Sequence, residues 1–278
     1  MALSDKGSPI KGRMMSENGL TEHPRLFRER IRQGIWQRST AGICPGYVQA
    51  NLVILPKEFA LDFTIFCLRN PQPCPILEIL EPGDPMVHEI AIDTDVRTDL
   101  PQYCIFKKGE LIEERKEIIE YWRNDLVTFL IGCSYTFEEA LVRGGVPIRN
   151  YLQKKDPGIY ISSIICRPAG IFSGPLVVTM RPIPPHLVSR TVQITSRFPK
   201  AHGAPVHIGH GSSIGISDLS KIDFGEIPEV GEGEIPVFWG CGVTPQAVAL
   251  KSKIPFMITH KPGHMFVSDL RIEELAIS

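Results

Sequence analysis

The chain has 278 residues, 43% hydrophobic and 22% charged, which is globular in composition and long enough for one large domain or two modest ones. Its 30 basic and 31 acidic residues leave a formal net charge of −1, which argues against a nucleic-acid or anionic-membrane partner and favours a small-molecule ligand. No apolar run reaches the ~18–20 residues that cross a bilayer, so we expect a soluble protein.

The N-terminal segment and the cysteines indicate the cellular compartment. Residues 1–20 are polar and glycine-rich, without the apolar block of a secretory signal, and are predicted to be a disordered tail. The seven cysteines are an odd number with irregular spacing and no C-x-x-C pair, which predicts reduced thiols in the cytoplasm. Most of them should pack as small buried hydrophobic side chains.

The first part of the chain is predicted to alternate helices with strands. A helix should run from Thr21, which can cap it, to Gly34, and the apolar run 47–55 predicts a strand buried on both faces. The elements expected next are a helix that Pro56 opens and Asn70 closes, a strand over residues 76–81 and a hairpin that turns near residues 107–109.

A long helix is predicted over residues 116–131, broken by the Gly-Cys-Ser-Tyr segment 132–135. Thr136 and Glu139 stand three apart and predict a capping box for the next helix, which Gly144 ends. In the second half, strands are expected at 159–166, 175–181, 206–208, 236–240, 256–260 and 265–267, and helices near Pro184-Pro185 and Thr244-Pro245.

Strands that alternate with helices are typical of an α/β fold. We therefore expect a mostly parallel central sheet with flanking helices and a smaller, intertwined α+β subdomain. The main subdomain should comprise residues 21–146 and 211–278, and the smaller one residues 147–210.

Cys133 and Ser134 lie just before a predicted helix N-terminus, where free amide N–H groups attract anions. Either side chain could meet a carboxylate substrate, with Cys133 as a nucleophile if its pKa is lowered. The alternative is that Cys133 only packs.

Arg181 ends a very apolar predicted strand, and its planar guanidinium is suited to holding a carboxylate. The alternative is a solvated strand end.

His207 and His210 stand three apart where a strand leads into a glycine-rich segment, and either suits acid–base chemistry near neutral pH. A nearby acid, Asp223 or Glu226, could orient His207 or could be an ordinary loop residue. A metal site would need a third ligand from elsewhere and H-E-x-x-H is absent, so we expect no metal.

A second strand–turn–helix junction carries Cys241, Gly242 and Thr244, where a ligand could approach backbone N–H groups. No G-x-G-x-x-G or P-loop pattern is present, so nucleotide binding is disfavoured. His260 and His264 add two further histidines, each of which could simply be satisfied within the fold.

The sequence resembles the bacterial "putative hydro-lyase" family, which is similar to one domain of the mitochondrial D-glutamate cyclases. The resemblance runs from about residue 28 to about residue 270, and the segments that carry it are 32–36, 40–42, 45–51, 97–101, 129–141, 175–184 and 236–245. It implies two intertwined α/β subdomains and a lyase that closes D-glutamate to 5-oxo-D-proline with loss of water. It assigns no catalytic residue. The family usually has an aspartate where this chain has His210, and often one where it has Glu226.

Such a reaction needs a clamp for a carboxylate, an acid–base group and donors for the developing oxyanion, and it calls for no metal or redox cofactor. We predict His207, Glu226 and Cys133 as catalytic candidates and Arg181, Ser134, Cys241, Gly242 and Thr244 as substrate-binding candidates. Arg181, His207 and the two cysteines should converge on one cleft. The alternative function is a non-catalytic carboxylate-binding accessory or regulatory protein, and a homo-oligomer stays open.

Overall fold

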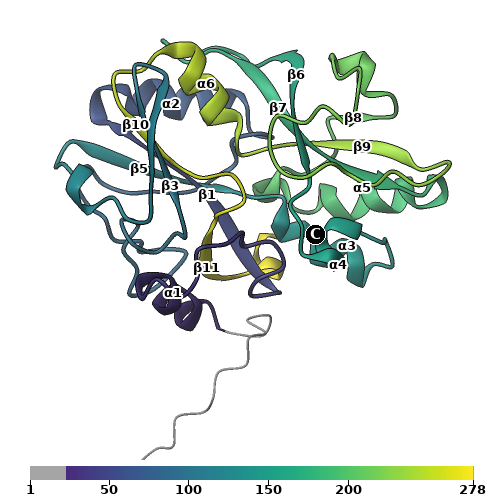
Figure 1. The fold of residues 1–278 in the computed structure, drawn as a ribbon, viewed down its shortest axis with the longest axis horizontal. Helices are drawn as coiled ribbons and strands as arrows, with labels where there is room; N and C mark the ends of the chain where they lie inside the picture. The colour runs from purple at the N-terminus through teal and green to yellow at the C-terminus, as the bar shows by residue number, and fades with distance from the viewer. Residues whose placement is uncertain (1–22, 278) are drawn as a thin grey trace, which may run out of the picture.

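The structure, a computed structural model, describes residues 23–277 and contains two β-sheets (Figure 1). The seven-stranded sheet has the order β2-β5-β1-β10-β3-β4, and β11 pairs with β1 beyond the end of β10. Its strands are β1 (Tyr47–Pro56), β2 (Ile76–Ile79), β3 (Tyr103–Lys107), β4 (Glu110–Arg115), β5 (Leu126–Gly132), β10 (Met257–His260) and β11 (Phe266–Arg271).

The four-stranded sheet has the order β6-β7-β9-β8. Its strands are β6 (Gly158–Ile165), β7 (Pro175–Ile183), β8 (His207–Ile208) and β9 (Ile235–Gly240). Because β9 belongs to it, this sheet draws on residues 158–240, beyond the 147–210 segment expected to form the smaller subdomain.

Six α-helices are described, and none is long and apolar enough to span a membrane. They are α1 (Pro24–Arg32), α2 (Lys57–Arg69), α3 (Tyr135–Arg143), α4 (Arg149–Gln153), α5 (Val188–Ser196) and α6 (Thr244–Ser252). Short 3-10 helices lie at Ile119–Tyr121, Pro185–Leu187, Pro199–Ala201, Gly211–Ile214 and Ile272–Leu275. The helix α1 packs against β11, at the opposite end of the molecule from α2 and α6 (Figure 1).

The expected mostly parallel sheet is wrong, because every strand pair described in both sheets is antiparallel. A parallel pair requires the helix between two strands to return the chain to a neighbouring position. Here α2 connects β1 to β2, but these strands are not neighbours; β5 lies between them. The order of helices and strands along the chain was therefore largely predicted, but not which strands are neighbours in the sheet.

The expected helix over residues 116–131 is also wrong. A single 3-10 turn, Ile119–Tyr121, is followed by β5, whose seven residues are all buried. Its apolar run Leu-Val-Thr-Phe-Leu-Ile fits a central strand covered on both faces, and a run of that kind cannot be told from a buried helix by periodicity alone.

Most other elements are confirmed within a few residues. In the predicted hairpin, β3 and β4 pair directly, and Lys108 and Gly109 both have positive φ (51° and 79°), as a tight two-residue turn requires. The capping box does not form: Ser134 is the N-cap of α3 and makes no side-chain cap bond. Thr21 and the predicted tail at 1–20 lie outside the described residues.

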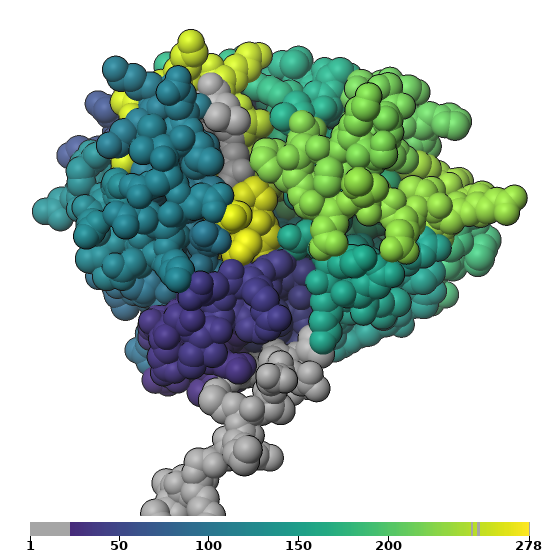
Figure 2. Space-filling model, viewed as in Figure 1, coloured from purple at the N-terminus to yellow at the C-terminus, as the bar shows by residue number. Residues whose placement is uncertain are grey.

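Two large hydrophobic clusters each join both sheets. One contains Leu130 of β5 with Trp239 of β9, and the other contains Phe129 of β5 with Phe238 of β9. In the space-filling view, segments of the first sheet lie on the left, the loops after residue 205 on the right, and C-terminal segments between them (Figure 2). The two sheets therefore share one interior.

Candidate functional site

Several predicted site residues meet where the two sheets join. We call this set the junction cluster: Asn51 of β1, Cys133 and Ser134 between β5 and α3, Glu138 of α3, Arg181 of β7 and Cys241 after β9. All six residues are buried.

Arg181 and Glu138 form the centre of the junction cluster. Arg181 Nε and Nη2 donate to Glu138 Oε1 at 2.8 and 2.6 Å, and Nη2 also donates to Ser134 Oγ at 3.0 Å. The two side chains are 1% and 0% exposed. Arg181 is therefore neither a solvated strand end nor a free clamp for a carboxylate, because Glu138 already holds its guanidinium.

The two carboxyl oxygens of Glu138 differ in their hydrogen-bond partners. Asn150 Nδ2 donates to Oε1 at 2.8 Å, as Arg181 does, whereas buried Oε2 has no hydrogen-bond partner in the described part of the chain. Burial raises the pKa of Glu138, and the charge of Arg181 opposes that shift. A carboxyl group with a raised pKa and an unused oxygen is suited to proton transfer.

Both thiols of the cluster are held in their protonated form. Burial raises the pKa of Cys241 to about 11 and that of Cys133 further still, although Arg181 lies close enough to oppose both shifts. A nucleophilic Cys133 would need a lowered pKa. Cys133 packs against Ala41, Tyr135 and Met265, so a packing role fits it better than a nucleophilic one.

Gly242 and Thr244 serve the cluster structurally. A Cβ at Gly242 would lie 2.0 Å from Asn51 Nδ2, so the missing side chain makes room for this amide. Asn51 Nδ2 donates to the carbonyl of Gly132 at 2.7 Å, and its buried Oδ1 has no described partner. Thr244 Oγ1 donates to the Cys241 carbonyl at 2.6 Å and accepts from Val177 N at 3.2 Å, which ties α6 to β7.

The structure does not bring His207 to this cluster. His207 pairs with Phe238, which pairs with Met180, whereas Arg181 pairs with Val237. Directly opposed residues of antiparallel strands share a face, and neighbours along a strand alternate. His207 and Arg181 therefore lie on opposite faces of the four-stranded sheet, and the expected convergence includes Cys133, Arg181 and Cys241 but not His207.

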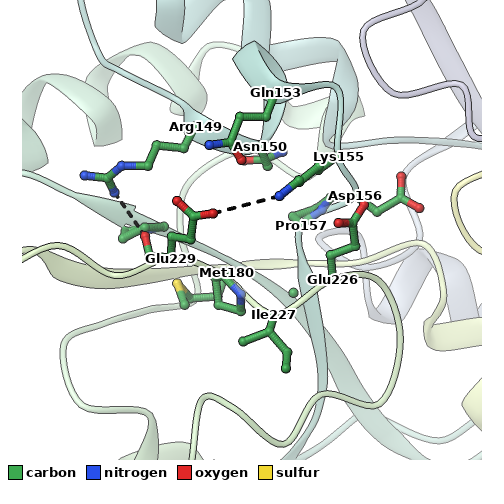
Figure 3. A pocket seen from close by; sticks show the side chains of 13 residues that line it. Arg149, Asn150, Gln153, Lys155, Asp156, Pro157, Met180, Glu226, Ile227 and Glu229 are labelled. Carbon is green, nitrogen blue, oxygen red and sulfur yellow. Dashed lines mark hydrogen bonds and ion pairs between the residues drawn. The ribbon is translucent and has the colours of Figure 1, made fainter.

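Glu226 is exposed and lines a small hollow beside the start of β6 (Figure 3). The hollow has a volume of about 30 Å³, which is room for one or two water molecules. Asn150, Lys155 and Asp156 also line it; Figure 3 shows the Lys155 ammonium directed toward Glu229. Since Asn150 also donates to Glu138, the hollow is connected to the junction cluster through one side chain.

Two other histidines proposed from the sequence are held by the backbone. His260 Nδ1 accepts from Leu52 N at 3.1 Å, which links β10 to β1, and burial lowers the pKa of His260 to about 4. His264 Nδ1 lies 3.0 Å from the Pro262 carbonyl. His210 contributes its carbonyl to His207 Nε2 at 2.9 Å.

Sequence reasoning missed Asn51, Glu138 and the buried His202. Asn51 interrupts an otherwise apolar strand, which is a usable signal, because a polar residue at a buried position needs partners. Glu138 lies in the first turn of α3, where an acidic residue is common, so the sequence gives no signal of its buried ion pair. His202 precedes a glycine in a loop, and nothing in its neighbourhood along the chain distinguishes it.

Four of the seven segments that carry the sequence resemblance supply the junction cluster. Residues 45–51 supply Asn51, 129–141 supply Cys133 to Glu138, 175–184 supply Arg181 and 236–245 supply Cys241. The family model for D-glutamate cyclase matches residues 127–269. A protein of Thermoanaerobacter sp. (strain X514) is 56% identical over 253 residues, which cover 91% of this chain and 96% of that protein.

The chain belongs to the D-glutamate cyclase family. The Thermoanaerobacter protein is named "Putative hydro-lyase", as are relatives in Geobacillus kaustophilus, 54% identical over 90% of this chain and 95% of that protein, and in Stutzerimonas stutzeri, 52% identical over 91% and 96%. Each of these three relatives therefore matches at least nine-tenths of this chain.

Proposed function

We propose that this D-glutamate cyclase family member is a hydro-lyase that closes a small amino dicarboxylic acid, of which D-glutamate is the model, to its lactam with loss of water. The observation that carries the proposal is the buried Arg181–Glu138 pair with the unpartnered Glu138 Oε2, placed where the family segments meet. The family names support the reaction class.

The chemistry asks for few groups. The amine nitrogen attacks the γ-carboxyl carbon, a C–N bond forms, a C–O bond breaks, and the departing oxygen leaves as water. Glu138 Oε2, which has no partner among the described residues and belongs to a carboxyl group whose pKa burial raises, passes a proton from the amine to the departing oxygen. The hollow of Figure 3 is the proposed approach, with Lys155 at its mouth available to a carboxylate because its ion pair with Glu229 is long, at 3.8 Å, and partly exposed.

Two observations favour the alternative, a carboxylate-binding protein without turnover. His207 and Glu226, the acid–base pair expected from the sequence, lie apart from Arg181, and the two thiols of the cluster have raised pKa values. This alternative predicts affinity for a small carboxylate and no product.

The test is to incubate the purified protein with D-glutamate, L-glutamate and both 5-oxoprolines and to follow the loss or gain of one water by mass spectrometry. In the hydrolytic direction, ¹⁸O-labelled water should place the label in the γ-carboxylate. We expect Glu138→Gln to lower kcat by about 10²–10⁴-fold, because the amide cannot give up a proton in this way. Glu120→Gln, an exposed residue paired with Arg115, is the matched control with unchanged rate.

The outcomes separate the two functions. Turnover of D-glutamate with loss of rate in Glu138→Gln supports the hydro-lyase. Calorimetric binding of a dicarboxylate without product from any substrate supports the binding protein. Full activity in Glu138→Gln would remove Glu138 from the mechanism.

A further inference from the structure

His202 is a buried residue with a strained backbone at the edge of the junction cluster. It follows the 3-10 turn Pro199–Ala201 with φ +76°, a left-handed conformation that is uncommon outside glycine, and its side chain is 1% exposed. Such strain persists only where the surroundings impose it, and it is concentrated at functional sites.

The surroundings hold this residue in place. A Cβ at Gly132 would lie 1.7 Å from the Lys200 carbonyl, so the turn that carries His202 packs directly onto the end of β5. The imidazole lies near the Gly132 backbone and within electrostatic range of Arg181. The Gly132 carbonyl also accepts from Asn51 Nδ2, so His202 and Asn51 both lie at the Gly132 backbone.

The hydrogen bond of the ring assigns its tautomer. Nδ1 lies 2.5 Å from the Gln72 carbonyl oxygen, which can only accept, so Nδ1 carries the hydrogen. Burial lowers the pKa of His202 to about 4, so the ring is neutral at pH 7 and Nε2 holds a lone pair. Nε2 has no partner with full hydrogen-bond geometry among the described residues, and the nearby Gly132 backbone favours the protonated ring.

We propose that His202 is the general base of the reaction proposed above, with Nε2 accepting a proton from the ammonium group of the substrate. This inference rests on the proposed function. A bound dicarboxylate brings negative charge that favours the imidazolium, which Arg181 and burial oppose in the free protein.

The protons balance over one cycle. His202 Nε2 takes one proton from the ammonium group. As the amine forms the C–N bond, Glu138 Oε2 takes a second proton from the nitrogen. The imidazolium of His202 and the protonated Glu138 each give their proton to the departing oxygen, the C–O bond breaks, and water leaves with both residues restored.

The test compares His202→Asn with the wild type. Asparagine tolerates a positive φ and can still donate to the Gln72 carbonyl, so it preserves the turn and removes only the base. We expect kcat to fall about 10²–10⁴-fold with little change in KM. His260→Asn, which alters another buried neutral histidine that links β10 to β1, is the control with kcat retained.

A second variant guards against a purely structural effect. His202→Gly accepts the same φ and leaves space for an imidazole ring, so added imidazole should restore part of the lost kcat. Loss of kcat without rescue by imidazole would assign His202 a structural role and overturn the proposal.

Two further results are distinguishable. A wild type that turns over D-glutamate together with a fully active His202→Asn overturns the base and leaves the hydro-lyase intact. A wild type without turnover overturns the proposed function, and His202 with it.

Discussion

Arg181 and Glu138 are two opposite charges that are almost completely buried, and each is stable in this interior only because the other is present. Each charge alone would be costly in this interior, since the effective penalty for burying an ion is several kcal/mol. The rings of Phe137 and Trp239 lie 5.2 and 5.6 Å from the guanidinium carbon of Arg181, which adds favourable contacts for the cation but none for the anion. The pair therefore fixes the relative position of α3 and β7.

We expect Arg181→Met to lower the free energy of unfolding by about 3–5 kcal/mol, because it leaves Glu138 buried without its counter-charge. The double variant Arg181→Met/Glu138→Leu should recover much of that loss, since no isolated charge remains. Urea unfolding at pH 7 measures both. Lys221→Met, which breaks an exposed pair with Asp218, should change stability by no more than about 0.5 kcal/mol.

Equal losses in the single and double variants would show that the packing of the arginine side chain, rather than its charge, stabilises this centre.

At the scale of elements, most strands were predictable because their signals are local, with β5 the exception. The apolar runs that became β1, β7 and β9 are continuous, and the Lys108-Gly109 turn needs only two residues to adopt positive φ. Pairing was not predictable in this way. The neighbours of β1 are β5, β10 and β11, which lie from about 70 to more than 200 residues further along the chain.

Local signals also determine which residues of the site could be predicted from the sequence. The sequence singles out Cys133, Ser134, Arg181 and Cys241 because each follows or ends an apolar run, and the structure brings them together because those element ends meet. His207 was placed in the same site by residue type, but its register opposite Phe238 turns it to the other face. His202 owes its environment to contacts with residues 70 or more positions away, at Gln72 and Gly132, that no local pattern records.

The identity of β5 as a strand leads to a prediction about Thr128. This residue pairs with Ile54, is fully buried, and its hydroxyl has no hydrogen-bond partner among the described residues. Thr128→Val replaces an unsatisfied hydroxyl with a methyl group of similar size. We expect it to stabilise the protein by about 1 kcal/mol, measured by urea unfolding.

The matched control is Thr195→Val. Thr195 Oγ1 donates to the Thr191 carbonyl and accepts from Trp239 Nε1 at 3.2 Å, so valine should cost about 1–3 kcal/mol by leaving the indole N–H unpaired. Destabilisation of similar size in both variants would mean that the Thr128 hydroxyl has a partner.

At the scale of the molecule, the two sheets act as one folding unit because both large clusters cross between them. The β10 strand is central to this arrangement: it lies between β1 and β3 in the seven-stranded sheet, and its His260 is bound to the Leu52 backbone. Protonation of the buried His260 ring is therefore expected to destabilise the contact between β1 and β10 at the centre of the seven-stranded sheet.

The last prediction concerns acid stability. Burial is the main cause that lowers the pKa of His260 from 6.5 to about 4, and nearby His264 adds to it. Between pH 6.5 and pH 4 the unfolded chain binds a proton at this position and the folded chain does not, so folding stability is lost as pH falls through that window. The loss amounts to about 3 kcal/mol by pH 4. His260→Asn lacks this titration, whereas His202 and Glu138 titrate alike in both proteins. Urea unfolding from pH 7 to pH 4 should therefore show the wild type losing about 3 kcal/mol more than His260→Asn, and parallel curves would show that the pKa of His260 is the same in the folded and the unfolded protein.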